Sequence, residues 1–486
     1  MKIYVVFDDS NLKSEIIRDV IGDKGFADVT VKKRKLENYY QEAVQRVFPE
    51  LEWKVIHSVF EFHELIKEME KREDIRILHC FSHFLISDIS KALLSYEKLR
   101  YVDEPYRGMS EKKTAILMFP DSAAYITFCN LICNDGKSSE EAAKHIKESF
   151  EIEGLVDIGI IGNFIQCITG NFDSRYFNSL QGNEYTLVKS STNKKKIKSE
   201  YTYYHLLPDD MKYWYVMPFD YKESENTASY TMERLHMTDL AIKWVHGSIS
   251  ISEFEEIMNK YFYFFKNRHR KACTKEEYEK VATALYTDKV VDRIEELKKC
   301  PEYKLLSKYL QDECAIDELV KQYFELKSLV ENKVKYDMIR VIGHGDPCFA
   351  NTLYNKSTKT LKFIDPKGAL SEEELWTNEY YDLAKLSHSV CGRYDFFNNA
   401  MYDIKINEDF SLDLNIPFDN SKYKETFRKK LEENGFDYLT VRIYEASLFL
   451  SMLPLHIDNP HKVLGFVLNV KNILEEIREC IKNTHS

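Results

Sequence analysis

The stretch "VIGHGDPCFANTLYNKSTKTLKFIDPKGAL", from Val341 to Leu370, holds an apolar run that ends in His-Gly-Asp and an alternating run that ends in Ile-Asp-Pro. Both runs predict strands, and the polar segment NKSTKT between them predicts a turn. Two such strands, paired as a hairpin, would bring Asp346, Asn351 and Asp365 toward one end. Three oxygen-bearing side chains on a rigid hairpin suit Mg²⁺, which prefers hard oxygen ligands and usually keeps waters and substrate phosphates.

Two interpretations of these acidic residues are open. Asp346 and Asp365 adjoin Gly345 and Pro366, so both are also typical turn formers. Phosphoryl transfer instead needs a carboxylate that orients and deprotonates the attacking hydroxyl, together with an Asn and an Asp that hold metal on the phosphates. The combined pattern H-G-D-x-x-x-x-N, then a strand, then Ile-Asp is more specific than an isolated turn, and it favours the catalytic interpretation.

The composition narrows the class of protein. The 486 residues, 44% of them hydrophobic and 30% charged, are typical of a folded globular chain of several domains. The net charge of −11 disfavours nucleic acid and anionic membranes as partners. No apolar stretch approaches the roughly 18 residues of a membrane span, so no membrane insertion is expected. The scattered cysteines form no C-x-x-C pair, and they predict free thiols in a reducing cytoplasm.

Residues 1–164 predict an α/β domain with a mostly parallel sheet. Runs such as KIYVVF, ADVTV, IRILHCF and TAILMF are typical of strands, and FHELIKEMEK and SEEAAKHIKESF are typical of helices between them. The first strand is followed by DDSNLKSE, which lacks the glycines of a phosphate-binding loop. Asp8 and Asp9 are interpreted as strand-end and helix-cap residues.

The pattern of predicted secondary structure changes after residue 164. Residues 165–236 contain short aromatic strands (YTLVKS, YWYVMPFDY and ASYTMERL) that predict a small antiparallel sheet. One helix, Asn193–Leu207, is expected to interrupt this sheet and to stop at Pro208. Residues 237–486 are mainly helical in pattern, and the stretch quoted above is expected to be the only strand-forming interruption.

The segments HGDPCFANTLY and LKFIDPKG resemble the catalytic and metal-binding segments of the aminoglycoside phosphotransferase and choline kinase-like family. These are small-molecule kinases with a protein-kinase-like fold. The resemblance implies that Asp346 is the catalytic-loop aspartate and that His344 is the structural histidine before it. It implies that Asn351 and Asp365 bind metal and that Asp382, in YYDLAKLSH, marks the helix that follows. The implied fold is a bilobal α+β domain with a largely helical C-terminal lobe.

The same resemblance implies an ATP site. Lys189 at the end of YTLVKS and Glu200 on the next helix match a strand lysine held by a helix carboxylate, as phosphoryl transfer requires. The alternative for Lys189 is an ordinary surface lysine. Ser174, in a loop with a single glycine, is the expected donor to the phosphates. The connection between the lobes is expected to pass the adenine through Met232, Glu233 and Leu235.

These expectations together describe an ATP-dependent, Mg²⁺-dependent cytoplasmic kinase that phosphorylates a hydroxyl of a small metabolite. An alcohol, a sugar or a sugar derivative for surface or capsular polysaccharide is the expected acceptor, and a homo-oligomer is left open. Two alternatives remain. One is a non-catalytic, nucleotide-binding pseudokinase in an assembly. The other is a nucleotidyltransferase acting through residues 1–164, which weakly resemble a degenerate sugar nucleotidyltransferase.

Overall fold

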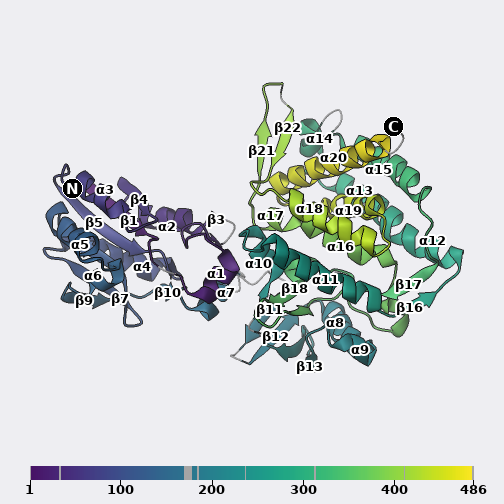
Figure 1. Ribbon diagram of the computed structural model, residues 1–486, viewed down its shortest axis with the longest axis horizontal. Helices are drawn as coiled ribbons and strands as arrows, with labels where there is room; N and C mark the ends of the chain where they lie inside the picture. The colour runs from purple at the N-terminus through teal and green to yellow at the C-terminus, as the bar shows by residue number, and fades with distance from the viewer. Residues whose placement is uncertain are drawn as a thin grey trace. The chain divides into compact units, whose positions relative to one another are not determined.

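The computed structural model describes residues 2–11, 13–31, 34–168, 178–182 (backbone), 185–235, 237–310, 314–409 and 411–483. The chain forms two compact units, Met1–Asp173 and Ser174–Ser486, called unit 1 and unit 2 below (Figure 1). Helix α7 (Ile161–Ile168) packs against α1 (Glu15–Ile21) inside unit 1. The division between the units therefore comes after this helix, whereas the sequence pattern placed it at residue 164.

Unit 1 is built on a six-stranded sheet. Its strands lie in the order β4 (Leu51–Ile56), β1 (Lys2–Asp8), β5 (Ile75–Phe81), β8 (Lys113–Phe119), β7 (Tyr106–Ser110) and β9 (Glu148–Glu151). β1 pairs in parallel with β4 and β5, but β8 runs antiparallel to both of its neighbours. The sheet is mixed: β7 and β9 are again parallel, and the prediction of a mostly parallel sheet fails at β8, whose two pairs are both antiparallel. The cause is the tight turn at Glu111 and Lys112, whose φ values of 48° and 67° suit a two-residue hairpin.

Several elements of unit 1 differ from the sequence pattern. ADVTV contributes only the two residues of β2 (Thr30–Val31), paired with β3 (Arg34–Lys35). In SEEAAKHIKESF only α6 (Ser139–Ala143) is helical, and the end of the run enters β9. The edge strand β4 was not predicted because it is only partly buried and carries charged residues. The remaining elements are α2 (Leu36–Gln45), α3 (Glu61–Met69), α4 (Ile89–Tyr96), α5 (Ser122–Asp135), β6 (Phe84–Ile86) and β10 (Leu155–Asp157).

The two aspartates after β1 are structural acceptors. Asp8 accepts from Ser10 Oγ at 2.6 Å and from Ser139 Oγ, and it lies 3.2 Å from the His79 ring. Asp9 does not cap a helix, contrary to the sequence-based interpretation, because Ser14 is the N-cap of α1. Asp9 accepts instead from the backbone of residues 26–27 and from Ser82 Oγ at 2.7 Å. Both carboxylates therefore fix the loops at the ends of β1 and β5.

Unit 2 begins with a four-stranded antiparallel sheet, as the sequence predicts. The order is β11 (Asn178–Gly182), β12 (Thr186–Ser191), β14 (Ala228–Glu233) and β13 (Pro218–Glu223). Helix α8 (Lys194–Leu206) begins at Asn193, whose side chain accepts from the Lys196 N–H at 3.1 Å, and it ends before Pro208. The helix lies against β13 and β14, with Ile197 buried beside Tyr230.

The stretch Val341–Leu370 contains three strands instead of the predicted two. β17 (Ile339–Ile342) pairs with β16 (Arg270–Ala272) and β20 (Trp376–Thr377), whereas β19 (Thr360–Phe363) pairs with β18 (Thr352–Asn355). The predicted pairing of the two apolar runs is therefore wrong, because the short polar run TLYN is itself the partner strand. Asn351 immediately precedes β18 and Ile364 immediately follows β19, and the Ile364 N–H donates to the Asn351 carbonyl at 3.0 Å.

Helices form most of the rest of unit 2, with β15 (Thr238–Asp239) and the hairpin β21–β22 (Asp403–Ile406, Leu412–Asn415) as further strands. The helices are α9 (Asp209–Lys212), α10 (Leu240–Val245), α11 (Ile251–Asn267), α12 (Lys275–Thr283), α13 (Lys289–Lys299), α14 (Tyr303–Tyr309), α15 (Ile316–Glu331), α16 (Glu379–Val390), α17 (Tyr394–Asn398), α18 (Ser421–Glu433), α19 (Tyr438–Met452) and α20 (Pro460–Asn483). A π-helical turn at 284–288 joins α12 to α13.

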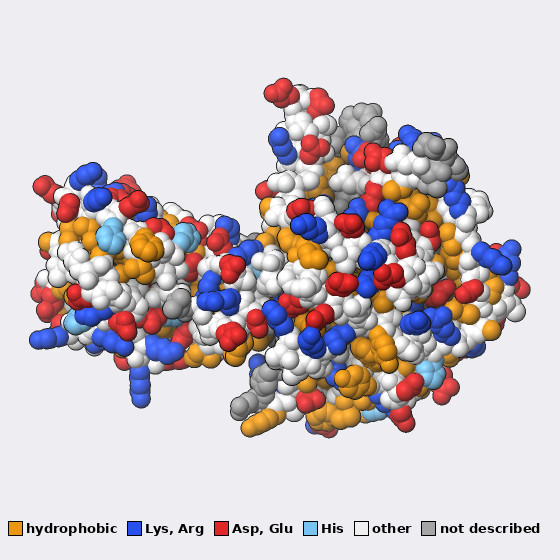
Figure 2. Space-filling view, in the orientation of Figure 1, with side chains coloured by type: hydrophobic (Ala, Val, Ile, Leu, Met, Phe, Trp, Pro, Cys, Tyr) orange, Lys and Arg blue, Asp and Glu red, His pale blue; other side chains and the backbone are white. Residues whose placement is uncertain are grey.

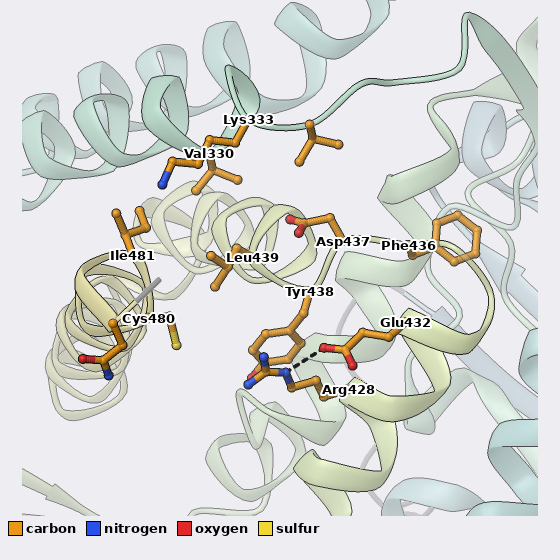
Figure 3. Close-up of a pocket in the computed structure, with 12 residues that line it drawn as sticks. Val330, Lys333, Arg428, Glu432, Phe436, Asp437, Tyr438, Leu439, Cys480 and Ile481 are labelled. Atoms are coloured by element: carbon orange, nitrogen blue, oxygen red, sulfur yellow. Dashed lines mark hydrogen bonds and ion pairs between the residues drawn. The ribbon is translucent and has the colours of Figure 1, made fainter. Parts of the chain in front are cut away.

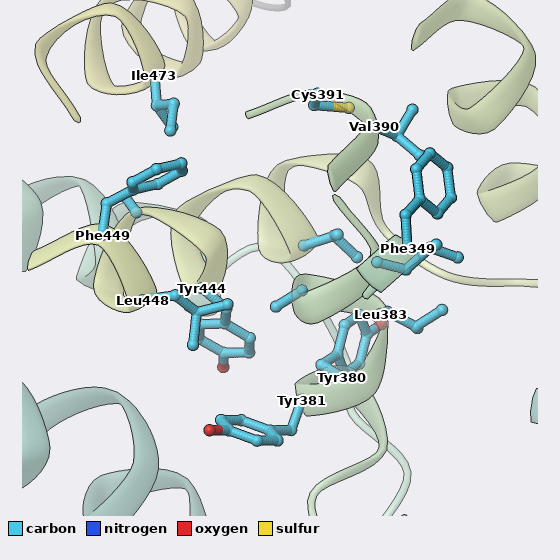
Figure 4. Packing of buried hydrophobic residues seen from close by; sticks show 14 of the residues in the cluster. Phe349, Tyr380, Tyr381, Leu383, Val390, Cys391, Tyr444, Leu448, Phe449 and Ile473 are labelled. Atoms are coloured by element: carbon cyan, nitrogen blue, oxygen red, sulfur yellow. The ribbon is translucent and has the colours of Figure 1, made fainter. Parts of the chain in front are cut away.

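Helices α16 and α19 form the centre of the unit 2 core. They pack against each other, and their aromatic and aliphatic side chains interleave (Figure 4). Figure 4 shows Tyr381 of α16 beside Tyr444 of α19, Leu383 of α16 near Phe349, and Ile473 of α20 above Phe449. On the face seen in Figure 2, acidic and basic side chains are interspersed with small apolar areas. Among the described residues, no helix combines the length and apolarity that crossing a membrane would require.

Candidate active site

A buried lysine connects the small sheet of unit 2 to the loop that follows β19. Lys189, on β12, lies 2.8 Å from Glu200 Oε2 on α8 and 2.7 Å from Asp365 Oδ1. The Lys189 and Glu200 side chains are 3% and 2% exposed, whereas the Asp365 side chain is 43% exposed. The sequence-predicted pair of strand lysine and helix glutamate is therefore present, and its ammonium group also contacts the predicted metal-binding aspartate.

The electrostatics keep Lys189 charged. Burial opposes its charge, but the carboxylates of Asp365 and Glu200 together raise the pKa of Lys189 above its ordinary value. Tyr230 supports the pair by donating its hydroxyl to Glu200 Oε2 at 3.1 Å. A buried ion pair with an added hydrogen bond fixes the position of the ammonium, and breaking such a pair from one side typically costs about 3–5 kcal/mol. The lysine is thus a fixed cation beside a solvent-facing carboxylate.

The loop between β17 and β18 is organised by His344. Its Nδ1 accepts from the Asp346 N–H at 3.0 Å, and its Nε2–H donates to the Ile364 carbonyl at 3.0 Å. Burial lowers the pKa of His344, which favours the neutral ring that these two bonds require. The Asn351 side chain donates to the Asp346 carbonyl at 2.9 Å. His344 and Asn351 therefore fix the backbone of Asp346 and do not use its carboxylate, whose side chain is 38% exposed.

Asp382 fastens the same loop to helix α16. Its carboxylate accepts from the N–H groups of His344 at 2.9 Å and Gly345 at 2.8 Å. It also forms an ion pair of 2.9 Å with Arg268, which in turn donates to the Glu379 carbonyl at 2.7 Å. Gly345 has a φ of 85°, and a Cβ there would lie 2.4 Å from the Lys367 Cβ, so glycine is required. Arg268 was not identified from the sequence, because its segment KNRHRK carries no local signal for this contact.

A cation also lies beside the predicted catalytic residue. Lys385 of α16 is 3.1 Å from Asp346 Oδ1, with its side chain 15% exposed. Burial opposes the Lys385 charge, but Asp346 and Tyr381 raise the pKa of Lys385 above its ordinary value. Tyr381 accepts from Lys289 Nζ at 3.1 Å, and although burial alone would raise the pKa of Tyr381, Lys385 and Lys289 lower it. Sequence analysis missed Lys385, although it lies one helical turn after Asp382 in YYDLAKLSH.

The donor set at the end of the β18–β19 hairpin fits a magnesium ion. Asp365 presents a partly exposed carboxylate, and the side chain of Asn351 uses its amide nitrogen on the protein, which leaves its oxygen for a ligand. The two residues are adjacent through the backbone bond of Ile364. Asp365 has a φ of 55°, a left-handed conformation that aspartate tolerates better than most residues. Two hard oxygen ligands suit Mg²⁺, which keeps several waters or phosphate oxygens.

Only some of the residues that are predicted to contact the nucleotide line the same hollow. Met232 lines a small hollow of about 30 Å³ together with Tyr230, Glu200 and Asp365. Glu233 ends β14 and pairs with Thr186 on β12, and Leu235 follows it in the connection toward β15. Ser174 and most of its loop lie outside the described residues. The roles of all these residues in binding a nucleotide stay predictions.

A larger hollow in unit 2 contains none of the predicted kinase residues. It measures about 490 Å³ and is lined by residues of α15, α18, α19 and α20, among them Val330, Arg428, Tyr438 and Ile481 (Figure 3). Arg428 forms an ion pair of 2.9 Å with Glu432 inside it. The chemistry described above is therefore separate from this hollow.

Comparisons with known proteins found similarity at the level of structure. No protein-family model matches the sequence, and no curated protein matches it. Solved structures that are similar to 61–64% of the chain include three kinases. They are a thermostable mutant of an aminoglycoside phosphotransferase in apo form (12% identity, 94% of that chain, TM-score 0.35), a glucosamine kinase in complex with glucosamine, ADP and inorganic phosphate (12%, 76%, 0.36) and a choline kinase from Cryptosporidium parvum Iowa II (10%, 89%, 0.38). All three bear the names of small-molecule kinases.

Proposed function

We propose that unit 2 transfers the γ-phosphate of ATP to a hydroxyl group of a small metabolite. The observation that carries this proposal is the position of Lys189, which contacts both Glu200 and Asp365. A lysine fixed by a buried helix carboxylate and directed at a metal-binding aspartate is the arrangement that phosphoryl transfer uses to position the triphosphate. Asn351 and Asp346 lie on the adjoining loop, which is bonded to the segment that carries Asp365.

Each residue has a distinct part in the proposed reaction. Lys189 would bind phosphate oxygens through the ammonium proton that its contacts with Glu200 and Asp365 leave over. Asp365 and Asn351 would hold Mg²⁺, which supplies charge neutralisation on the phosphates. Asp346 would accept a hydrogen bond from the acceptor hydroxyl and then its proton, at the carboxylate that faces solvent. Lys385 would keep that carboxylate oriented until the acceptor arrives.

A phosphate-transfer screen with ATP and Mg²⁺ tests the proposal. The acceptors are amino alcohols, sugars, amino sugars and sugar acids; a sugar-derived precursor of surface polysaccharide is one acceptor class that the sequence resemblance suggests. The expected result is transfer to at least one hydroxyl compound, abolished in Lys189→Met. The matched control is Lys195→Met, which removes an exposed lysine from helix α8 and is expected to retain full activity. Equal activity of the two variants, or no transfer and no nucleotide binding in any condition, would contradict the proposal.

A further inference from the structure

Unit 1 contains a hollow of about 450 Å³ at the carboxyl ends of its parallel strands. Asn11, Lys13 and Ser14, from the loop after β1, line one side, and His83, from the loop after β5, lines another. The chain crosses from β1 to β4 on one side and returns to β5 on the other, so the strand order reverses between β1 and β5. In open α/β sheets this reversal leaves a crevice at the strand ends, which is where ligands bind.

The lining of this hollow is cationic, although the whole chain carries a net charge of −11. Its charged side chains are Lys13, Arg107, Lys112, Lys113 and Lys144 on one hand and Glu140 and Asp157 on the other. Asp157 is neutralised by Lys113 and also accepts from the Gly159 N–H at 2.8 Å. The His83 ring lies 3.4 Å from Glu140. Burial lowers the pKa of His83, so its ring does not neutralise Glu140, and Asp157 is the acidic group of the hollow that a neighbouring cation neutralises.

Three cations of the lining remain uncompensated. Arg107, Lys112 and Lys144 form no ion pair with any residue that the structure describes. Two buried donors in the same lining, Arg107 Nε and Asn11 Nδ2, have no hydrogen-bond partner within the described ranges. Buried donors without partners are uncommon in folded proteins, and they are ordinarily satisfied by water or by a ligand. This combination of free charge and free donors suits an acceptor with several oxygens.

We propose that this hollow, called the unit 1 cleft, binds a phosphorylated small molecule of the size of a nucleotide or a sugar phosphate. Phosphate oxygens accept short, charge-assisted hydrogen bonds from guanidinium and ammonium groups, and Arg107, Lys112 and Lys144 supply these groups. The volume of the cleft falls in the range of ordinary small-molecule sites, about 300–1,000 Å³. In this proposal the cationic side chains take the part of the glycine-rich loop that DDSNLKSE lacks.

Calorimetric titration of the full-length protein tests this site independently of the kinase proposal. The probes are UDP, glucose 6-phosphate and inorganic phosphate. The cleft variant is Lys112→Glu/Lys144→Glu, which reverses two exposed charges, and the matched control is Lys67→Glu/Lys71→Glu, which makes the same charge change on exposed lysines of unit 1 outside the cleft. Equal melting temperatures of the two variants establish that both are folded. Lys189→Met separates this binding from binding at the kinase site.

The expected result is that at least one of UDP and glucose 6-phosphate binds with a Kd below about 1 mM. The cleft variant should bind that probe at least about tenfold more weakly, since it loses charge-assisted hydrogen bonds to the phosphate. The control variant and Lys189→Met should bind as the natural protein does. Preference for UDP identifies a nucleotide ligand, and preference for glucose 6-phosphate identifies a sugar phosphate. No binding of either probe, equal binding by the cleft and control variants, or loss of all binding in Lys189→Met would overturn the proposal.

Discussion

Replacement of Asp346 by asparagine separates a catalytic base from a turn former. Asparagine keeps the shape of the side chain, and the backbone bonds of Asp346 to His344 and Asn351 do not involve the carboxylate. The variant should bind ATP normally, and its phosphate transfer should fall by roughly 10²- to 10⁴-fold, the usual effect of losing a general base. If the residue only forms a turn, asparagine should serve almost as well.

The effect of this substitution on stability follows from the contact with Lys385. At 3.1 Å and an effective dielectric constant of about 20, the two charges attract by about 5 kcal/mol. Solvent screening of the exposed carboxylate, desolvation of the lysine and ordering of both side chains reduce the net contribution to about 1–2 kcal/mol. For a unit of this size, the melting temperature should fall by only about 1.5–3 °C. Folding should therefore remain intact in Asp346→Asn.

Lys385→Met is the control that distinguishes the loss of the catalytic base from the loss of the ion pair between Asp346 and Lys385. It loses the same attraction but keeps the Asp346 carboxylate, so its melting temperature should fall by a similar amount. Its single-turnover rate of ATP cleavage, measured with ³²P-labelled nucleotide, should fall by less than about tenfold. A near-normal rate in Asp346→Asn, or equal losses in the two variants, would refute the assignment of Asp346 as the base.

Three further outcomes are expected. Asp365→Ala should weaken ATP binding in the presence of Mg²⁺ but not in EDTA, as measured by calorimetry, and equal losses in both conditions would count against metal binding. Burial raises the pKa of Asp395 to about 7, so the stability that its neutral form contributes is fully present below about pH 4, the ordinary range of an aspartate, and is lost as the pH rises from there through 7. Between pH 5 and pH 8, chemical denaturation should show Asp395→Asn gaining about 2–3 kcal/mol relative to the natural protein, and a constant difference would contradict this. A fragment of residues 174–486 should retain nucleotide binding, because unit 2 is compact by itself; loss of binding by a fragment with native circular dichroism would contradict this prediction.

The sequence predicted contacts best where residue types and spacing are both constrained. HGDPCFAN placed His344, Asp346 and Asn351 in one loop, and the lysine of YTLVKS and Glu200 do meet. The functions assigned to them remain predictions. Arg268 and Lys385 could not be predicted, because their importance depends on contacts with Asp382 and Asp346 that only the folded chain creates.

The errors in the predicted strands can also be traced to short segments of the chain. The TLYN run is short and polar, so it lacks the apolar pattern from which β18 could have been recognised. The direction of β8 depends on Glu111 and Lys112, which adopt positive φ values although neither is a glycine. A turn of this kind has no clear signature in the sequence, and one such turn is enough to reverse a strand.

The double contact of Lys189 also has a consequence for the order in which ligands arrive. Without nucleotide, the Asp365 carboxylate is already balanced by an ammonium group 2.7 Å away. A free divalent ion would have to compete with that positive charge, which lowers its affinity for the empty protein. A metal ion carried by the triphosphate meets no such barrier, because the phosphates attract Lys189 and release the carboxylate. We therefore expect magnesium to enter together with ATP. In the empty protein, the ammonium group of Lys189 should prevent the ion from binding first.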